Sequence, residues 1–197
     1  MNFLAHAFLS FNDPEILVGN MISDFVKGKR QYDFDLKIQK GIKLHRQIDE
    51  FTDKHPATKK ASAILKPIIG TYAGAFTDVV YDHFLAKDVH QFSDISLHLL
   101  AANTYSILEL HESILPEKFG KMLPFMKQQN WLVNYGKVTG IEKSFAGLAR
   151  RAKFLDNSTM AYECFIDNYK AFETCYHLFF PELKNQTIIY YNDLQTP

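Results

Sequence analysis

The spacing of apolar residues is the feature that most restricts the fold of this chain. Apolar residues recur mostly three and four positions apart, and alternation with a period of two is rare. The first spacing is that of a buried helix face, whereas the second would indicate strands. We therefore predict an all-α protein that folds as a compact multi-helix bundle. The predicted helices cover residues 2–10, 14–27, 34–54, 57–66, 71–87, 94–114, 117–134, 140–154, 158–178 and 181–191.

Capping residues and prolines support these helix boundaries. Asp13 precedes a proline and Ser93 precedes an aspartate, so each is expected to cap the helix that follows. Pro116 and Pro181 are expected to open two further helices, because proline suits the first helical turn. His55, which also precedes a proline, is predicted to be a turn and cap residue.

Length and composition indicate one domain whose overall charge does not favour a nucleic acid or membrane partner. The 197 residues suffice for one well-filled core and no segment resembles a linker, so we expect a single helical domain over residues 1–197. Hydrophobic residues make up 47% and charged residues 22%, which argues against disorder. The formal net charge is zero, so no overall field would attract nucleic acid or an anionic membrane.

The sequence shows no sign of export or membrane insertion. Its first ten residues lack a basic start and a histidine interrupts their apolar run, unlike a signal peptide. Uncharged stretches are shorter than the roughly 18 residues of a spanning helix. Cys164 and Cys175 are predicted to lie on one helix about 16 Å apart, beyond disulfide reach. We expect a soluble, cytoplasmic protein with two reduced cysteines.

One apolar stretch, residues 76–86, contains acidic side chains that are costly to bury. Asp78 and Asp82 are four residues apart, so a helix places them on one face, with His83 about 100° round from Asp82. A buried carboxylate needs a cation, a metal ion or several hydrogen-bond donors. This segment therefore predicts one part of a metal site.

Further ligand candidates lie in the first half of the chain. His45 and Asp49 are also four residues apart on a predicted helix, and His6 and Asp24 are each polar residues in apolar surroundings. Carboxylates and imidazoles without a thiolate favour Mn²⁺, Mg²⁺ or Fe²⁺. Motifs of other chemistries, such as a Walker A loop, a G-x-S-x-G elbow or H-E-x-x-H, are absent from the sequence.

Structural roles for the same residues remain open at this stage. A histidine in an apolar helix is commonly a hydrogen-bonded core residue, and Asp24 and Asp49 could lie on helix surfaces. Asp78 and Asp82 could instead pair with Arg150 or Arg151.

Four segments carry a resemblance to a known family: residues 1–6 (MNFLAH), 19–28 (GNMISDFVKG), 41–56 (GIKLHRQIDEFTDKHP) and 81–86 (YDHFLA). In this order and spacing they resemble the acyl carrier protein phosphodiesterase family, whose members are regarded as non-standard relatives of the all-helical HD phosphohydrolases. The resemblance implies an HD-like bundle and hydrolysis of the phosphodiester that joins 4′-phosphopantetheine to a serine of holo acyl carrier protein. It also implies a divalent metal, usually Mn²⁺.

The chain departs from the ordinary HD signature, so ligands cannot be copied from typical HD enzymes. None of its eight histidines is followed directly by aspartate, and Asp82-His83 has the reverse order. We expect the site to divide into three groups of residues. The metal ligands are Asp24, His45, Asp49, Asp78 and Asp82; the catalytic residues are His6, Asp24, His83 and Arg46; and the phosphate contacts are Lys27 and Arg46.

The expected partner is the holo acyl carrier protein itself, and the sequence does not indicate an oligomeric state. An acidic carrier could dock on a group of basic residues near the proposed site: Lys27, Lys29, Arg30, Lys37, Lys40 and Lys43. The same residues could equally form a solvated helix face. Two other functions stay open. One is a phosphohydrolase of a nucleotide or other small phosphoester, and the other is a helical protein that binds the carrier without turnover.

Overall fold

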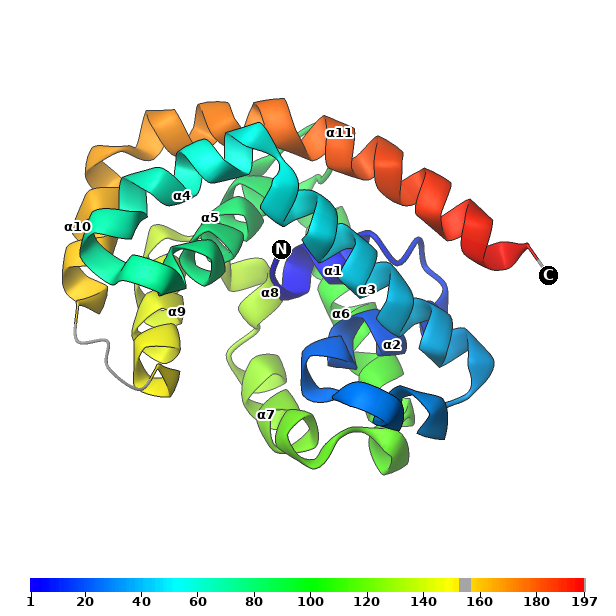
Figure 1. The fold of residues 1–197 in the computed structure, drawn as a ribbon. Coiled ribbons are helices and arrows are strands. Elements are labelled where there is room, and N and C mark those ends of the chain that lie inside the picture. Colours follow the sequence, from blue (N-terminus) through cyan, green and yellow to red (C-terminus); the bar gives the residue numbers. More distant parts are fainter. Residues whose placement is uncertain (153–156, 197) are drawn as a thin grey trace.

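The computed structural model describes residues 1–152 and 157–196, and it confirms the predicted all-α fold (Figure 1). These residues form α-helices and short 3₁₀ turns, and no strand occurs among them. The α-helices are α1 Phe3–Phe8, α2 Pro14–Ile22, α3 Leu36–Lys54, α4 Pro56–Ile69, α5 Ala73–Lys87, α6 Asp94–Leu110, α7 Glu117–Gln128, α8 Trp131–Asn134, α9 Val138–Arg151, α10 Ser158–Asp167 and α11 Tyr169–Gln195.

The predicted capping residues occupy the expected positions. The Asp13 side chain accepts from the backbone N–H of Ile16, and Ser93 forms a reciprocal capping box with Ser96. His55 separates α3 from α4, and its side chain accepts from the backbone N–H of Ala57. Each cap satisfies a donor that its helix leaves unpaired, which explains why the boundaries fall there.

The C-terminal part differs from the prediction in where one helix ends and the next begins. The predicted helix 158–178 is divided at Asn168, and Pro181 lies inside α11 instead of opening a helix. Proline has no N–H group, so Pro181 leaves the backbone carbonyl of His177 without its helical partner. Both residues are exposed, and water can satisfy that carbonyl. Cys164 and Cys175 therefore belong to different helices, and both are free thiols.

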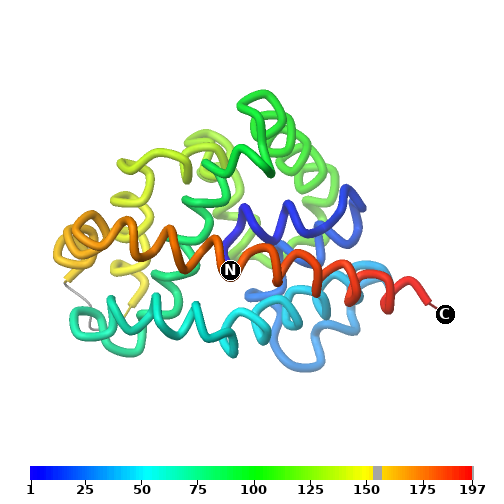
Figure 2. The backbone as a smooth tube through the Cα atoms, turned by 90° about the horizontal axis from the view of Figure 1, so that it is seen from above, coloured from blue at the N-terminus to red at the C-terminus, as the bar shows by residue number. Residues whose placement is uncertain are grey.

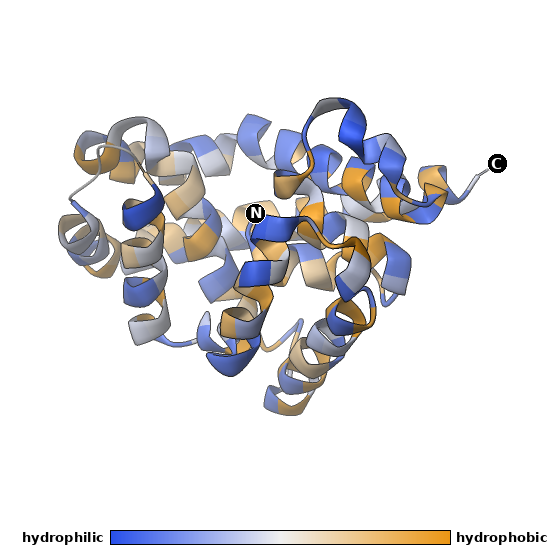
Figure 3. Cartoon of the chain, turned by 90° about the horizontal axis from the view of Figure 1, so that it is seen from below, coloured by the Kyte–Doolittle hydropathy of each residue, from blue (hydrophilic) through white to orange (hydrophobic). Residues whose placement is uncertain are grey.

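The helices place the N-terminus in the middle of the molecule. α11 runs lengthwise across one side, and α4 runs beside it (Figures 1 and 2). The start of α1 lies below them, near α5 (Figure 1). Polar and apolar colours alternate along the helices, as expected where one face of each helix packs inward (Figure 3). The first residues of the chain are therefore enclosed, and Met1 is only 6% exposed.

Helices α2 and α3 approach so closely that their main chains touch. A Cβ atom on Gly19 would lie 2.1 Å from the backbone oxygen of Ile38, and one on Gly41 would lie 2.3 Å from that of Ile16. Neither glycine has room for a side chain, so the spacing of the two helices depends on both. This matters because α2 and α3 carry residues of the candidate site.

Replacing Gly41 with alanine is expected to destabilise the protein by about 3 kcal/mol or more, since main chains must separate to admit one methyl group. The matched control is Gly120→Ala on α7, where the nearest atom to a new Cβ is a side-chain carbon 4.0 Å away. This control should be neutral or stabilising by up to about 1 kcal/mol. Urea unfolding measures both, and equal stability of the two variants would contradict the close approach.

Within the described residues, none of the helices has the length and apolar character needed to cross a membrane.

Candidate metal centre

Three side chains that are distant in sequence meet near the N-terminus. His6 lies on α1, and His45 and Asp49 lie one turn apart on α3. The two imidazole rings stack with centroids 3.9 Å apart and planes within 14° of parallel. Their Nε2 atoms lie 3.3 Å (His6) and 3.0 Å (His45) from the Asp49 carboxylate oxygens. We refer to these three residues as the His–Asp cluster.

Asn20 on α2 fixes the orientation of both imidazole rings. Its side-chain oxygen lies 2.8 Å from Nδ1 of His6, and its backbone oxygen lies 2.7 Å from Nδ1 of His45. Both oxygens only accept, so each Nδ1 carries a proton and donates it. The Asn20 amide nitrogen donates to the His6 carbonyl and to Ser10, which fixes the direction of the amide. Each ring therefore turns its Nε2, the atom that would bind a metal, towards Asp49.

The charges around the cluster favour a cation between the rings and the carboxylates. Burial and the neighbouring His45 lower the pKa of His6 to about 4, so this imidazole is neutral at pH 7. Burial lowers the pKa of His45, but hydrogen bonds with Asp24 and Asp49 outweigh burial and raise it to about 9. The pKa of Asp49 is held well below its usual range because the Met1 ammonium and His6 overcome the effect of burial.

The N-terminal ammonium group is part of the same arrangement. It lies 3.2 Å from Asp49 and 3.1 Å from Asp78, and these carboxylates raise its pKa to about 11 against the effect of burial. Burial raises the pKa of Asp78, and the ammonium opposes that rise. Among the described residues no ion pair joins Asp78 or Asp82 to Arg150 or Arg151, so the alternative pairing considered from the sequence is wrong.

Asp82 caps the first helix from a distance in sequence. Its carboxylate accepts from the backbone N–H groups of Asn2, Leu4 and Ala5 at 3.3, 2.7 and 3.3 Å. These donors belong to the first turn of α1 and have no partner within that helix. Burial raises the pKa of Asp82 to about 7. Asp82 was predicted as a metal ligand, but both of its oxygens are engaged by the main chain of α1.

His83 lies away from the cluster, between two tyrosines. Its Nδ1 donates to the backbone oxygen of Tyr135 at 2.7 Å, and its Nε2 lies 2.9 Å from the hydroxyl of Tyr169. The side chain is fully buried among aromatic rings. His83 was predicted as a catalytic residue; in the structure both of its ring nitrogens have protein partners.

The buried His83 is expected to make the protein less stable in mild acid. Burial lowers its pKa from 6.5 to about 4, so between these values the unfolded chain binds a proton that the folded protein does not. Stability therefore falls as pH decreases from 6.5 towards 4, by up to about 1.4 kcal/mol per pH unit for this group. In chelator-treated protein, His83→Asn should reduce the slope measured by urea unfolding. An unchanged slope would contradict this assignment.

A surface depression of about 530 Å³ gives access to the cluster. Asp24, His45, Arg46 and Asp49 are among the residues that line it. Asp24 is 72% exposed and lies 3.2 Å from Nε2 of His45, whose hydrogen bond lowers the Asp24 pKa. Arg46 is exposed and donates to the Gln31 side chain at 2.6 Å.

The predicted basic residues follow α3 and the turn before it. Lys27, which was predicted to contact phosphate, is exposed and does not line the depression. Lys37 forms ion pairs with Asp13 and Glu15, so its charge is already balanced. Other exposed members of the predicted docking group are Lys29, Arg30 and Lys43.

The donor set of the cluster fits a divalent metal ion. One ligand atom from each of His6, His45 and Asp49 lies within 4.8 Å of the other two. The His6 Nε2 atom is buried and makes no well-aligned hydrogen bond, although an Asp49 oxygen lies close by. Such an atom is costly to bury unless a ligand uses it. Once His45 gives up its Nε2 proton, two imidazole nitrogens and a carboxylate suit a borderline or hard divalent cation.

Sequence reasoning missed two groups that shape this centre. Asn20 belongs to the segment 19–28, but no role was predicted for it from the sequence. A polar asparagine in an apolar helix is a signal of a buried hydrogen-bond network. The Met1 ammonium was not considered at all. Its ion pairs depend on the enclosure of α1, which no local pattern predicts.

Comparison with known proteins identifies the family. The profile described as "Acyl carrier protein phosphodiesterase" matches residues 1–183. A relative named acyl carrier protein phosphodiesterase from Photorhabdus laumondii is 30% identical over 182 residues, 92% of each chain. One of the same name from Escherichia coli O6:H1 is 31% identical over 189 residues, covering 94% of this chain and 97% of the relative. This chain belongs to the acyl carrier protein phosphodiesterase family.

Family membership confirms the resemblance drawn from four short segments. The match to the acyl carrier protein phosphodiesterase family includes the whole of α1 to α10 and part of α11, so it covers every residue of the His–Asp cluster. No solved structure matches this chain.

Proposed function

We propose that this protein is a metal-dependent phosphodiesterase that releases 4′-phosphopantetheine from holo acyl carrier protein and leaves the apo carrier. The observation that carries the proposal is the convergence of His6, His45 and Asp49 in a member of a family named for this reaction. Both histidines turn their Nε2 atoms towards Asp49, and Asn20 accepts both Nδ1 protons.

The residues that would hold the ion are His6, His45 and Asp49, with Asp24 at the exposed edge. When bound, a divalent ion polarises a phosphoryl oxygen and lowers the pKa of a water molecule. Mn²⁺ is our first choice, with Mg²⁺ and Fe²⁺ as alternatives. The ion would take the place of the proton that His45 holds between Asp24 and Asp49.

The remaining residues act by binding and orientation. Arg46 lies at the rim of the depression, where its guanidinium can neutralise charge on a phosphodiester. Asp78 holds the Met1 ammonium against Asp49, and Asp82 fixes the start of α1, which carries His6. We propose positioning roles for Asp78 and Asp82, and a structural role for His83.

Two wider expectations belong to the same proposal. We propose that residues 1–197 work as one domain, because buried residues from Met1 to Leu194 form a single hydrophobic cluster. We also place the protein in the cytoplasm, where its two free cysteines would stay reduced.

Mass spectrometry of the carrier tests the reaction. Metal-free protein is incubated with holo acyl carrier protein and Mn²⁺, and the carrier is weighed for loss of phosphopantetheine. Loss that requires both protein and Mn²⁺ is expected, and a chelator should stop it. An unchanged carrier mass would reject the reaction. Hydrolysis of only a small phosphodiester would then favour the small-phosphoester alternative, and binding without turnover would favour the carrier-binding one.

A further inference from the structure

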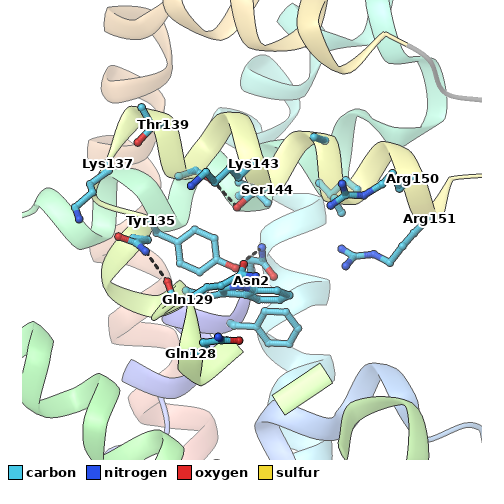
Figure 4. A pocket seen from close by; sticks show the side chains of 18 residues that line it. Asn2, Gln128, Gln129, Tyr135, Lys137, Thr139, Lys143, Ser144, Arg150 and Arg151 are labelled. Carbon is cyan, nitrogen blue, oxygen red and sulfur yellow. Dashed lines mark hydrogen bonds between the residues drawn. The ribbon is translucent and has the colours of Figure 1, made fainter. Parts of the chain in front are cut away.

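A second and larger pocket lies next to the metal centre and has no role in the chemistry described above. Its volume is about 870 Å³, within the range of sites that enclose small organic ligands. The walls come from α8, from α9 and from the first residues of the chain (Figure 4). This pocket is separate from the depression over His45, because no residue lines both.

The inner wall of the pocket combines aromatic rings with amide groups. The Phe3 and Trp131 rings lie 6.3 Å apart, and the Asn2 amide donates to the Tyr135 hydroxyl at 3.1 Å (Figure 4). Further amides and hydroxyls line the same space on Gln128, Gln129, Asn134, Thr139 and Ser144. Such a lining suits a ligand with alternating amide and alkyl groups, since each amide needs both a donor and an acceptor.

The outer edge of the pocket is basic. Four exposed cations contribute to it: Lys137, Lys143, Arg150 and Arg151. Among the described residues that line the pocket, none is acidic. In a chain of zero net charge this edge is a local positive region. It would attract an acidic protein surface around the mouth of the pocket.

Two residues of the pocket wall are next in sequence to groups at the metal centre. Asn2, in its wall, follows Met1, whose ammonium contacts Asp49 and Asp78. Val79, which follows Asp78, also lines the pocket. Adjacent residues have Cα atoms only about 3.8 Å apart, so this wall of the pocket lies close to the residues that contact Asp49.

We propose that this pocket receives the pantetheine arm of the carrier's prosthetic group, while the acidic carrier faces the basic edge. The inference rests on the proposed function. Pantetheine is a flexible chain with two amides, a hydroxyl and a pair of methyl groups. Its amides match the side-chain amides of Asn2 and Asn134, and its methyl groups match Phe3 and Trp131. The phosphate would remain at the His–Asp cluster.

Gly147 allows the pocket to be filled with little disturbance of the fold. It lines the pocket on α9, and a Cβ there would have only the end of the Arg150 side chain within 4 Å, at 3.9 Å. Gly147→Trp therefore places a bulky ring in the open space. The matched control is Gly120→Trp on α7, which is also helical, has similar room and does not line the pocket.

Two measurements follow for both variants after their melting temperatures confirm folding. The first is calorimetric binding of free 4′-phosphopantetheine with Mn²⁺ present. The second is kcat/KM for holo carrier protein divided by kcat/KM for bis(4-nitrophenyl) phosphate, which lacks the arm. Gly147→Trp is expected to weaken binding and to lower this ratio by at least about tenfold, and Gly120→Trp should match the wild type.

Equal binding by Gly147→Trp and the wild type would overturn the inference, and so would absence of binding to the wild type. Failure of the proposed function has a different signature. In that case the wild type leaves the holo carrier intact, whereas binding of 4′-phosphopantetheine and its loss in Gly147→Trp would still support the pocket assignment. Tight binding of a nucleotide or an anionic vesicle in place of 4′-phosphopantetheine would assign the pocket to another ligand and overturn the inference.

Discussion

Asp49→Asn is expected to lower Mn²⁺ affinity by at least about 100-fold and to remove most of the phosphodiesterase activity. The Asp49 carboxylate lies within 3.3 Å of His6, His45 and the Met1 ammonium, so one neutral amide cannot replace its charge or all its contacts. The Asp49 side chain is 36% exposed, so losing its ion pairs should cost less than the roughly 3–5 kcal/mol of a fully buried pair. Equilibrium dialysis against Mn²⁺ and urea unfolding measure the two effects separately.

The control for this substitution is Asp35→Asn at the other end of α3. Asp35 occupies the position before the helix, is exposed, and its side chain makes no capping hydrogen bond. The control should keep wild-type metal affinity and stability. If Asp49→Asn bound Mn²⁺ as tightly as Asp35→Asn, the His–Asp cluster would not be the metal centre.

Asn20→Leu is expected to lower Mn²⁺ affinity by about 10- to 100-fold although Asn20 is not a proposed ligand. The substitution removes the acceptor of the His6 Nδ1 proton and the donor to Ser10, so the ring of His6 is free to turn and to change tautomer. The buried groups left without partners should cost about 1–3 kcal/mol of stability. Metal affinity is measured under conditions where the variant is folded.

Thr187→Val separates the positioning effect from simple destabilisation. Thr187 is fully buried on α11 and donates to the Leu183 carbonyl, remote in sequence from every cluster residue. Its replacement should cost about 1 kcal/mol and leave Mn²⁺ affinity unchanged. If both variants lost the same metal affinity, the role assigned to Asn20 would be wrong.

Much of the fold was predictable because its signals are local. The side chains of Asp13, Ser93 and His55 accept from backbone N–H groups two or three residues further along the chain. These helix boundaries could therefore be inferred from the local sequence. The break at Asn168 was missed because the apolar pattern continues through it. Pro181 was misjudged because a proline is tolerated inside a helix where the freed carbonyl reaches water.

The site was harder to predict because its partners come from distant segments. Periodicity correctly placed Asp78 and Asp82 on one face of α5, but their partners are the ammonium of Met1 and the first turn of α1. His83, adjacent in sequence, turns to Tyr135 instead. A helical pattern gives the direction of a side chain relative to its own helix, and it does not say which element lies opposite.

The contact between α2 and α3 has a consequence for protein engineering. Gly19 and Gly41 bring the two backbones together, and the Asn20 carbonyl that orients His45 belongs to one of those backbones. The orientation of this imidazole therefore depends on main-chain geometry as well as on its side-chain partners. A designer who wished to transplant the centre would copy residues 14–25 and 36–54 as one unit, and would add a helix that presents His6 and is held at its start as Asp82 holds α1.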